Sequence, residues 1–218
     1  MARDGAATRR HIIDAAYALF YKRGFARAGV DAIAAAAGVT KRTFYYHFDS
    51  KGTLVAEVLG AQHELMLMHI GQWFDRARGD PFSMTEILFS DFATWAREPK
   101  WQGSGFTRVA MELAGSPGHP GRAAARRHKA AVERLFAERL ALDGVSDSAK
   151  FARQIVLLIE GCNSLVLIHG DTAYAEAARD AARCLVKQHL DARLVPQKHA
   201  MLSSRPKVAR FMPRAART

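Results

Sequence analysis

This 218-residue chain has little of what marks a secreted, metal-binding or membrane protein. Its two cysteines, Cys162 and Cys184, fall in helical patterns with neither metal-ligand spacing nor a secreted context, so we expect buried, unpaired thiols. No apolar run reaches the roughly 18 residues that a membrane span needs, and no signal peptide opens the chain. We therefore expect a cytoplasmic protein without membrane contact.

The sequence signatures of common enzymes are also missing. The chain has no G-x-S-x-G, no phosphate-binding glycine loop, no H-E-x-x-H and no paired carboxylates in a plausible site. Four histidines of the middle segment are too scattered to indicate a metal site: His63, His69, His128 and His169. We expect neither an enzyme nor a bound metal or cofactor.

Positive charge is concentrated at the two ends of the chain. Residues 1–52 hold nine Lys and Arg against four acids, residues 53–195 hold seventeen of each, and residues 196–218 hold six bases and no acid. We predict an N-terminal domain over 1–52, a helical domain over 53–195 and a disordered basic tail over 196–218. The basic N-terminal segment favours a phosphate-rich partner. The tail could add non-specific DNA affinity or only solubility.

The most informative stretch runs from residue 30 to residue 54. Apolar residues recur there at helical spacing up to Gly38, which sits where a helix end commonly needs a left-handed residue. Thr40 is a good N-cap for a second helix, and Val39 and Phe44 have the spacing of a hydrophobic staple. Two helices joined by so tight a turn predict a helix-turn-helix. We expect a first helix over about 8–23 to pack against this pair.

The second helix of this pair has two contrasting faces. Phe44 and Phe48 form its apolar side, whereas the other side carries cations, hydroxyls and aromatic rings but no carboxylate. This composition suits insertion into the DNA major groove. A solvated basic face is the alternative, although two exposed tyrosines would be unusual there. We expect base contacts from Arg42, Thr43 and Tyr46, and phosphate contacts from Thr40, Lys41, Tyr45, His47 and Lys51.

The stretch AGVTKRTFYYHFDSKGTL resembles the DNA-binding signature of the TetR family of bacterial transcriptional regulators. The resemblance covers about Thr8 to Leu59 and implies an all-α fold of about nine helices. A three-helix headpiece would join a helical ligand-binding and dimerisation domain. A homodimer would bind a palindromic operator in double-stranded DNA. One departure is Gly29, where the family usually has a Ser or Thr that caps the helix and contacts a phosphate; Gly caps only weakly.

Two C-terminal helical patterns carry regular apolar seams. One, over about 147–169, repeats through Phe151, Ile155, Leu158, Cys162, Leu165 and His169; the other, over about 172–190, repeats through Ala175, Ala178, Ala182, Leu185 and His189. A bulky seam beside a small one suits close antiparallel packing. The pair resembles the family's dimerisation helices, so we expect a homodimer through these helices. Packing within one chain is the alternative.

The resemblance also implies a small-molecule effector in the helical body. The residues expected to line its pocket are Trp73, Phe89, Phe92, Trp95, Phe106 and Met111, with Asn163 and His169 as polar anchors. Such a pocket suits a flat, largely hydrophobic ligand, although ordinary core packing is the alternative for each residue. The expected function is a homodimeric repressor that this ligand releases from DNA. The alternative is a DNA-binding dimer without an effector.

Overall fold

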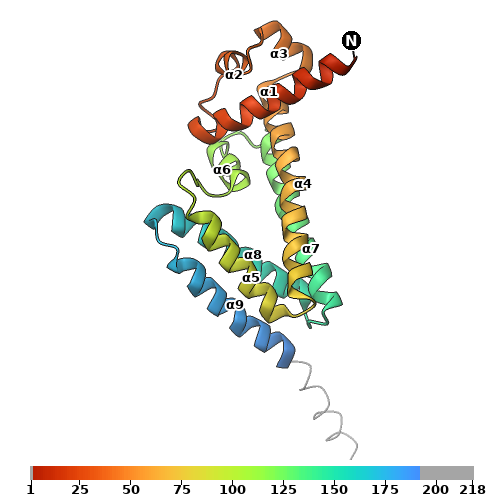
Figure 1. The fold of residues 1–218 in the computed structure, drawn as a ribbon, viewed down its shortest axis with the longest axis vertical. Helices are drawn as coiled ribbons and strands as arrows, with labels where there is room; N and C mark the ends of the chain where they lie inside the picture. Colours follow the sequence, from red (N-terminus) through yellow and green to blue (C-terminus); the bar gives the residue numbers. More distant parts are fainter. Residues whose placement is uncertain (1, 192–218) are drawn as a thin grey trace, which may run out of the picture.

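The computed structural model describes residues 2–191, which form nine α-helices (Figure 1). Their bounds are α1 (Ala2–Arg23), α2 (Val30–Ala36), α3 (Lys41–His47), α4 (Lys51–Ala77), α5 (Pro81–Ala96), α6 (Gly105–Glu112), α7 (Pro120–Leu142), α8 (Ser148–His169) and α9 (Ala173–Asp191). The predicted all-α fold is confirmed. The predicted basic tail at 196–218 lies outside the described residues.

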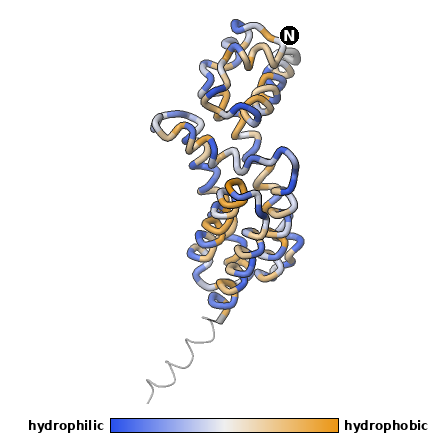
Figure 2. Tube along the Cα trace, turned by 90° about the vertical axis from the view of Figure 1, so that its left-hand side faces the viewer, coloured by the Kyte–Doolittle hydropathy of each residue, from blue (hydrophilic) through white to orange (hydrophobic). Residues whose placement is uncertain are grey.

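The molecule is elongated, with α1 to α3 gathered at one end (Figure 1). The long helix α4 runs from this headpiece into the body, where it packs against α5 and α7. Helix α7 packs in turn against α6 and α8, and α9 lies against α5 and α8. Apolar and polar residues alternate along these helices, as helices with one buried face require (Figure 2). Since α4 belongs to both ends, any rotation of it would move the headpiece.

Two apolar cores hold the chain together. The first joins the headpiece helices to the start of α4, and it also takes Phe106 and Val109 from α6 and two alanines from α7. The second lies between α4, α5, α7, α8 and α9, around Phe89, Phe136 and Phe151. The first core therefore crosses the predicted boundary at residue 52, and α6 packs as part of the headpiece.

Some sequence expectations differ from the structure. Helix α1 begins at Ala2 instead of near Thr8, since the first residues continue the same helix. Both cysteines are unpaired, as predicted, but only Cys162 is buried, and burial raises the pKa of its thiol to about 11. Cys184 is exposed on the outer side of α9, because the buried side of that helix follows its alanines.

Helix α8 also departs from the expectation that no stretch could span a membrane. Its length and composition are sufficient for a span, although one such helix is weak evidence because core helices of soluble proteins pass the same test. Here α8 packs between α7 and α9, with Phe151, Ile155 and Cys162 buried inside the chain. These contacts account for its apolar character on one side.

Candidate DNA-binding surface

The turn between α2 and α3 has the predicted geometry. Gly38 lies in the left-handed region, at φ +61°, which lets the chain leave α2 sharply. Thr40 then caps α3, because its Oγ1 accepts a hydrogen bond of 3.0 Å from the backbone N–H of Thr43. Cap and glycine therefore hold the two short helices at a fixed angle.

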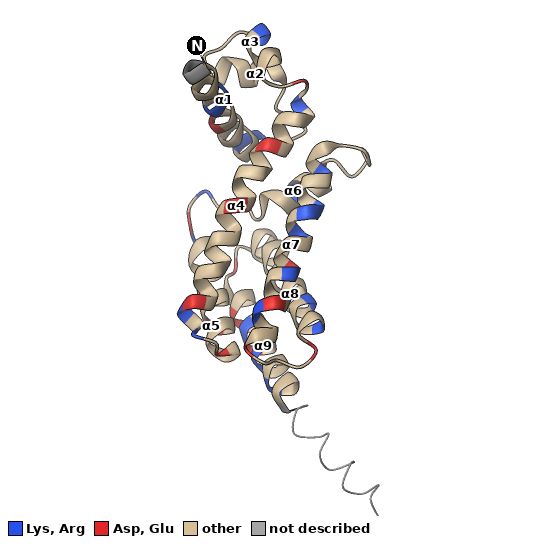
Figure 3. Ribbon diagram, turned by 90° about the vertical axis from the view of Figure 1, so that its right-hand side faces the viewer, with Lys and Arg blue, Asp and Glu red and all other residues tan. Residues whose placement is uncertain are grey.

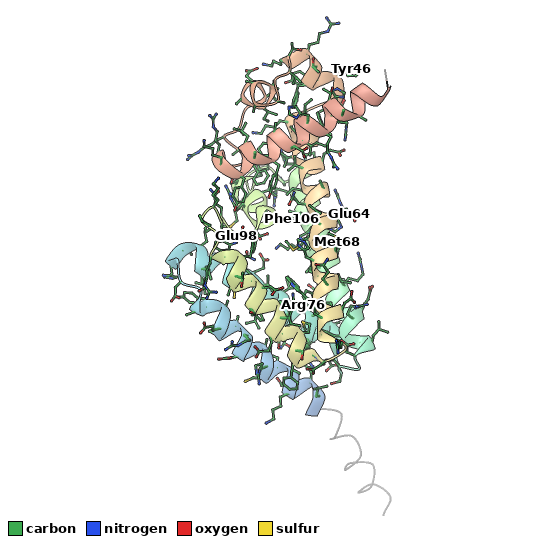
Figure 4. All side chains as sticks on the ribbon, viewed as in Figure 1. Tyr46, Glu64, Met68, Arg76, Glu98 and Phe106 are labelled. Carbon is green, nitrogen blue, oxygen red and sulfur yellow. The ribbon has the colours of Figure 1, made fainter. Side chains whose placement is uncertain are left out.

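Helix α3 is anchored by one side and exposed on the other. Phe44 is completely buried and its ring lies 5.7 Å from that of Phe48, which follows the helix and is also buried. Tyr46 on the opposite side is 83% exposed, at the headpiece end of the molecule (Figure 4). Arg42 and Tyr45 are exposed as well, while Thr43 and His47 are half-buried. The predicted faces of α3 are thus present in the fold.

The two lysines expected at phosphates already have partners within the chain. Lys41 forms an exposed ion pair of 3.0 Å with Asp31 of α2, and the hydrogen bond in this pair raises the pKa of the lysine. Exposed pairs of this kind contribute little and can exchange for a phosphate. Lys51 donates a 2.9 Å hydrogen bond to the carbonyl of Ala26, and burial lowers its pKa. Lys51 therefore also holds the loop before α2.

The start of α4 lies beside this surface. Ser50 caps α4 by accepting a 3.1 Å hydrogen bond from the N–H of Thr53. Gly29 caps α2 in an extended conformation without a side-chain hydrogen bond, so α2 forms despite the missing Ser or Thr. A Cβ at Gly29 would meet no atom within 4 Å.

Helix α6 is tied directly to the headpiece, which the sequence did not reveal. The N–H of Ala26 donates a 2.9 Å hydrogen bond to Oε2 of Glu112, the last residue of α6. Arg108 lies 3.6 Å from the same carboxylate and donates to the carbonyl of Tyr21 in α1. These contacts join segments more than eighty residues apart, so no local pattern could have indicated them.

The structure scatters the residues predicted to bind an effector. Phe89 and Phe92 are buried in the second core, and Trp73 donates a 3.0 Å hydrogen bond to Asp91. Met111 is 71% exposed, and His169 is exposed and stacks on Tyr174. Trp95 contacts both Phe92 and Trp101 edge to face.

Two of the predicted ligand residues have features that suit a binding site. Asn163 is buried, and its Oδ1 has no hydrogen-bond partner within residues 2–191. Phe106 lines a cavity of about 560 Å³ between α6, α7 and α8. The ring of Phe106 also stacks on the ring of His128 in α7, with the two ring centroids 3.5 Å apart. The ligand-binding role of all eight residues stays a prediction.

Two histidines that sequence reasoning treated as scattered are in contact. His63 of α4 and His128 of α7 place their Nδ1 atoms 2.9 Å apart, so one ring donates and the other accepts. Burial, together with neighbouring positive charge, lowers the pKa of His128 to about 3. The part of the chain that the structure describes holds no group of three or more metal-ligating residues.

The predicted dimer seams lie mostly inside the chain. Phe151, Ile155 and Cys162 of α8 and all three alanines of the α9 seam are buried among α5, α8 and α9. For these residues the alternative of internal packing is correct. The reason is that both helices fill the second core with their most regular apolar side. Another side of α8 is left uncovered, with Leu157 66% and Ile168 71% exposed.

Comparison with known proteins finds sequence similarity mainly in the headpiece. Residues 12–58 match the model of the family described as bacterial regulatory proteins, tetR family. The regulator TtgR of Pseudomonas putida is 49% identical over 57 residues, which are 26% of this chain and 27% of that protein. AcrR of Shigella flexneri is 38% identical over 86 residues, 37% and 38% of the two chains. The match thus spans between a quarter and two fifths of these relatives.

Solved structures extend the likeness to the body. A TetR-type chain from Streptomyces avermitilis is 28% identical, with a TM-score of 0.66 over 81% of this chain and 98% of that one. A TetR-family transcriptional regulator from Streptomyces coelicolor shares the fold, with 23% identity and a TM-score of 0.71 over 84% and 96%. Signature, headpiece geometry and overall fold agree. The chain therefore carries the headpiece of the TetR family of bacterial regulatory proteins, and its body shares the fold of TetR-family transcriptional regulators.

Proposed function

We propose that this protein is a homodimeric, sequence-specific DNA-binding transcriptional regulator. One observation carries the proposal: Phe44 anchors α3 so that its cationic and hydroxyl-bearing side faces outward at the end of the molecule. Within residues 41–47 that side carries no carboxylate, so nothing on the helix repels a phosphate backbone. The likeness of the headpiece to TtgR and AcrR, both named as transcriptional regulators, supports the same function.

The exposed side chains divide into two roles. Arg42 and Tyr46, together with Thr43, would read base edges, since they project from the face opposite the buried Phe44. Thr40, Lys41, Tyr45, His47 and Lys51 would hold phosphates. Lys41 would do so by exchanging Asp31 for a phosphate oxygen. The free N–H groups at the start of α4, beside Ser50 and Lys51, favour a phosphate there too.

Dimerisation would use the uncovered side of α8. Leu157, Gly161, Leu165 and Ile168 recur at helical spacing and are exposed or half-exposed, and the neighbouring helix α9 exposes small residues at Ala177, Ala181 and Cys184. An exposed apolar face of this extent marks an association surface. Two copies packed through it would present two headpieces to the half-sites of a palindrome.

Regulation is proposed to be repression relieved by a small, largely hydrophobic effector in the helical domain of residues 53–195, with the protein acting in the cytoplasm. The buried Oδ1 of Asn163 and the cavity beside Phe106 support an effector. A DNA-binding dimer without an effector is the second candidate. It is favoured by the burial of Phe89 and Phe92 in a packed core.

The division of roles is tested with two substitutions on α3. Arg42→Ala should relax base preference at one or two positions and cost about 1–3 kcal/mol on the preferred duplex. Lys41→Ala should weaken all duplexes alike and reduce the salt slope by about one. Fluorescence anisotropy on the preferred duplex and on scrambled duplexes, at several salt concentrations, measures both effects. Equal loss of sequence preference in the two variants would contradict the assignment.

A further inference from the structure

The cavity between α6, α7 and α8 has an apolar wall. Phe106 and Ala110 of α6, Ala123 of α7 and Val156 of α8 line it, together with Pro117 of the loop before α7. Its volume of about 560 Å³ falls in the range of sites for small organic molecules. Figure 4 shows Phe106 on α6, between the headpiece and the lower helices of the body. An apolar ring or chain would therefore find contact on several sides.

The polar part of the cavity has an excess of positive charge. Arg122, Arg126 and Lys129 of α7 line it, and Glu160 of α8 is its one lining acid. Basic residues recur along this part of α7 (Figure 3). Lys129 pairs with Oε1 of Glu160, whose Oε2 accepts a 2.7 Å hydrogen bond from Thr107, so each oxygen of this carboxylate already has a partner. Within residues 2–191, neither Arg122 nor Arg126 forms an ion pair with an acid.

The two arginines differ in what they already contact. Arg122 donates a 3.0 Å hydrogen bond to the carbonyl of Ala114, which orients the guanidinium without neutralising it. Arg126 is exposed and makes no ion pair or hydrogen bond within residues 2–191. Arg122 lies in the first turn of α7, where the helix dipole adds positive potential, and Arg126 lies one turn further along the same helix. An anionic head group would thus meet two cations and the positive end of a helix.

The wall of the cavity is connected to the headpiece by two routes. Phe106 stacks on His128, which contacts His63 of α4. Glu112, at the other end of α6, accepts the hydrogen bond from Ala26 in the loop before α2. A molecule wedged against α6 would therefore press on both α4 and the base of the headpiece.

We propose that this cavity binds an amphipathic carboxylate, with its apolar body against Phe106 and Val156 and its head group between Arg122 and Arg126. Binding displaces α6 and so changes the position of the headpiece. The regulatory half of this inference rests on the proposed function, whereas the binding half does not. The inference also narrows the effector from a hydrophobic molecule to an anionic one.

Binding is measured by calorimetry on the full chain without DNA. The probes are a ten-carbon chain and a phenylbutyl group, each carrying a carboxylate, an alcohol or an amine. For at least one of the two apolar groups, the probe with a carboxylate should bind at least tenfold more tightly than the probes with an alcohol or an amine. The reason is that only the anion accepts charge-assisted hydrogen bonds from the arginines. Equal or tighter binding of alcohol or amine, or no binding by any of the six probes, would overturn the proposal.

Two arginines of α7 provide a matched pair of variants. Arg126→Gln should weaken carboxylate binding about tenfold, whereas Arg127→Gln, on an exposed neighbour that does not line the cavity, should leave it unchanged. Ala123→Trp should fill the cavity and abolish binding. Equal effects of the two arginine substitutions, or full binding by Ala123→Trp with native helicity, would contradict the site.

The link to DNA is measured separately with the preferred duplex. The bound carboxylate should lower the DNA affinity of the wild type and of Arg127→Gln but not of Arg126→Gln at the same probe concentration. Unchanged wild-type DNA affinity at saturating carboxylate would overturn the coupling. If the carboxylate binds but the chain shows no sequence-specific DNA binding, the proposed function fails and the site stands. If the chain binds DNA specifically but binds no carboxylate, the proposed site fails and the proposed function stands.

Discussion

The two faces of α3 allow stability and DNA binding to be separated by two substitutions on one short helix. Phe44 is completely buried and is the one residue of α3 in the headpiece core. Phe44→Ala removes a ring that contacts Phe48 and Tyr45, at centroid distances of 5.7 and 5.2 Å, and leaves a cavity. Truncation of a buried Phe to Ala lowers the free energy of unfolding by about 3–5 kcal/mol. For a chain of this length that corresponds to a melting temperature lower by about 6–20 °C.

Tyr46→Ala is the matched control, because Tyr46 is 83% exposed on the same helix. Its effect on stability should stay within about 0.5 kcal/mol, while its affinity for the preferred duplex should fall. Thermal unfolding followed by circular dichroism, together with fluorescence anisotropy, measures the two quantities. The reasoning would be refuted if Phe44→Ala melted within a degree of the wild type, or if Tyr46→Ala lost stability and kept full DNA affinity.

Three further predictions follow from particular contacts. Gly29→Ser should add a cap to α2 without steric conflict, raise stability by a few tenths of a kcal/mol and tighten DNA binding; unchanged urea unfolding and anisotropy would contradict this. Leu157→Glu should yield monomers in sedimentation velocity while the exposed Glu64→Gln leaves the dimer intact, and a dimeric L157E protein would exclude the α8 face. His128 is neutral in the folded chain, with its pKa lowered to about 3, so the unfolded state binds the extra proton and stability falls as pH drops from about 6.5. His128→Asn should flatten this slope, up to ~1.4 kcal/mol per pH unit, in urea unfolding at pH 7, 6 and 5; an equal slope in both proteins would contradict it.

The headpiece could be predicted because its determinants are local. Gly38, Thr40 and Phe44 lie within seven residues, and each acts on backbone or side-chain neighbours in the same stretch. The start of α4 at Ser50 is set in the same way by its cap. Helical periodicity was likewise sufficient to place α8 and α9 of the body within one residue of their observed bounds.

Features that depend on packing between distant segments could not be predicted. Periodicity indicates that α8 has an apolar side but not which partner covers it, so Phe151 and Ile155 were assigned to a dimer seam although they fill the second core. The contact between His63 and His128, and the bond from Ala26 to Glu112, join residues 65 and 86 positions apart. Residues of three helices, α6, α7 and α8, line the cavity beside Phe106. The spacing of aromatic residues in the sequence could therefore not locate it.

Selection of random duplex DNA by the purified protein, followed by sequencing and salt titration, tests the central claim most directly. A dimeric regulator that reads bases through Arg42, Thr43 and Tyr46 predicts a palindromic site of about 15–25 base pairs, with two half-sites separated by the distance between the headpieces. Substitution of Arg42 by Ala should then blur one or two positions in each half-site. Enrichment of no sequence, with binding that is uniform and disappears as salt rises, would contradict the account.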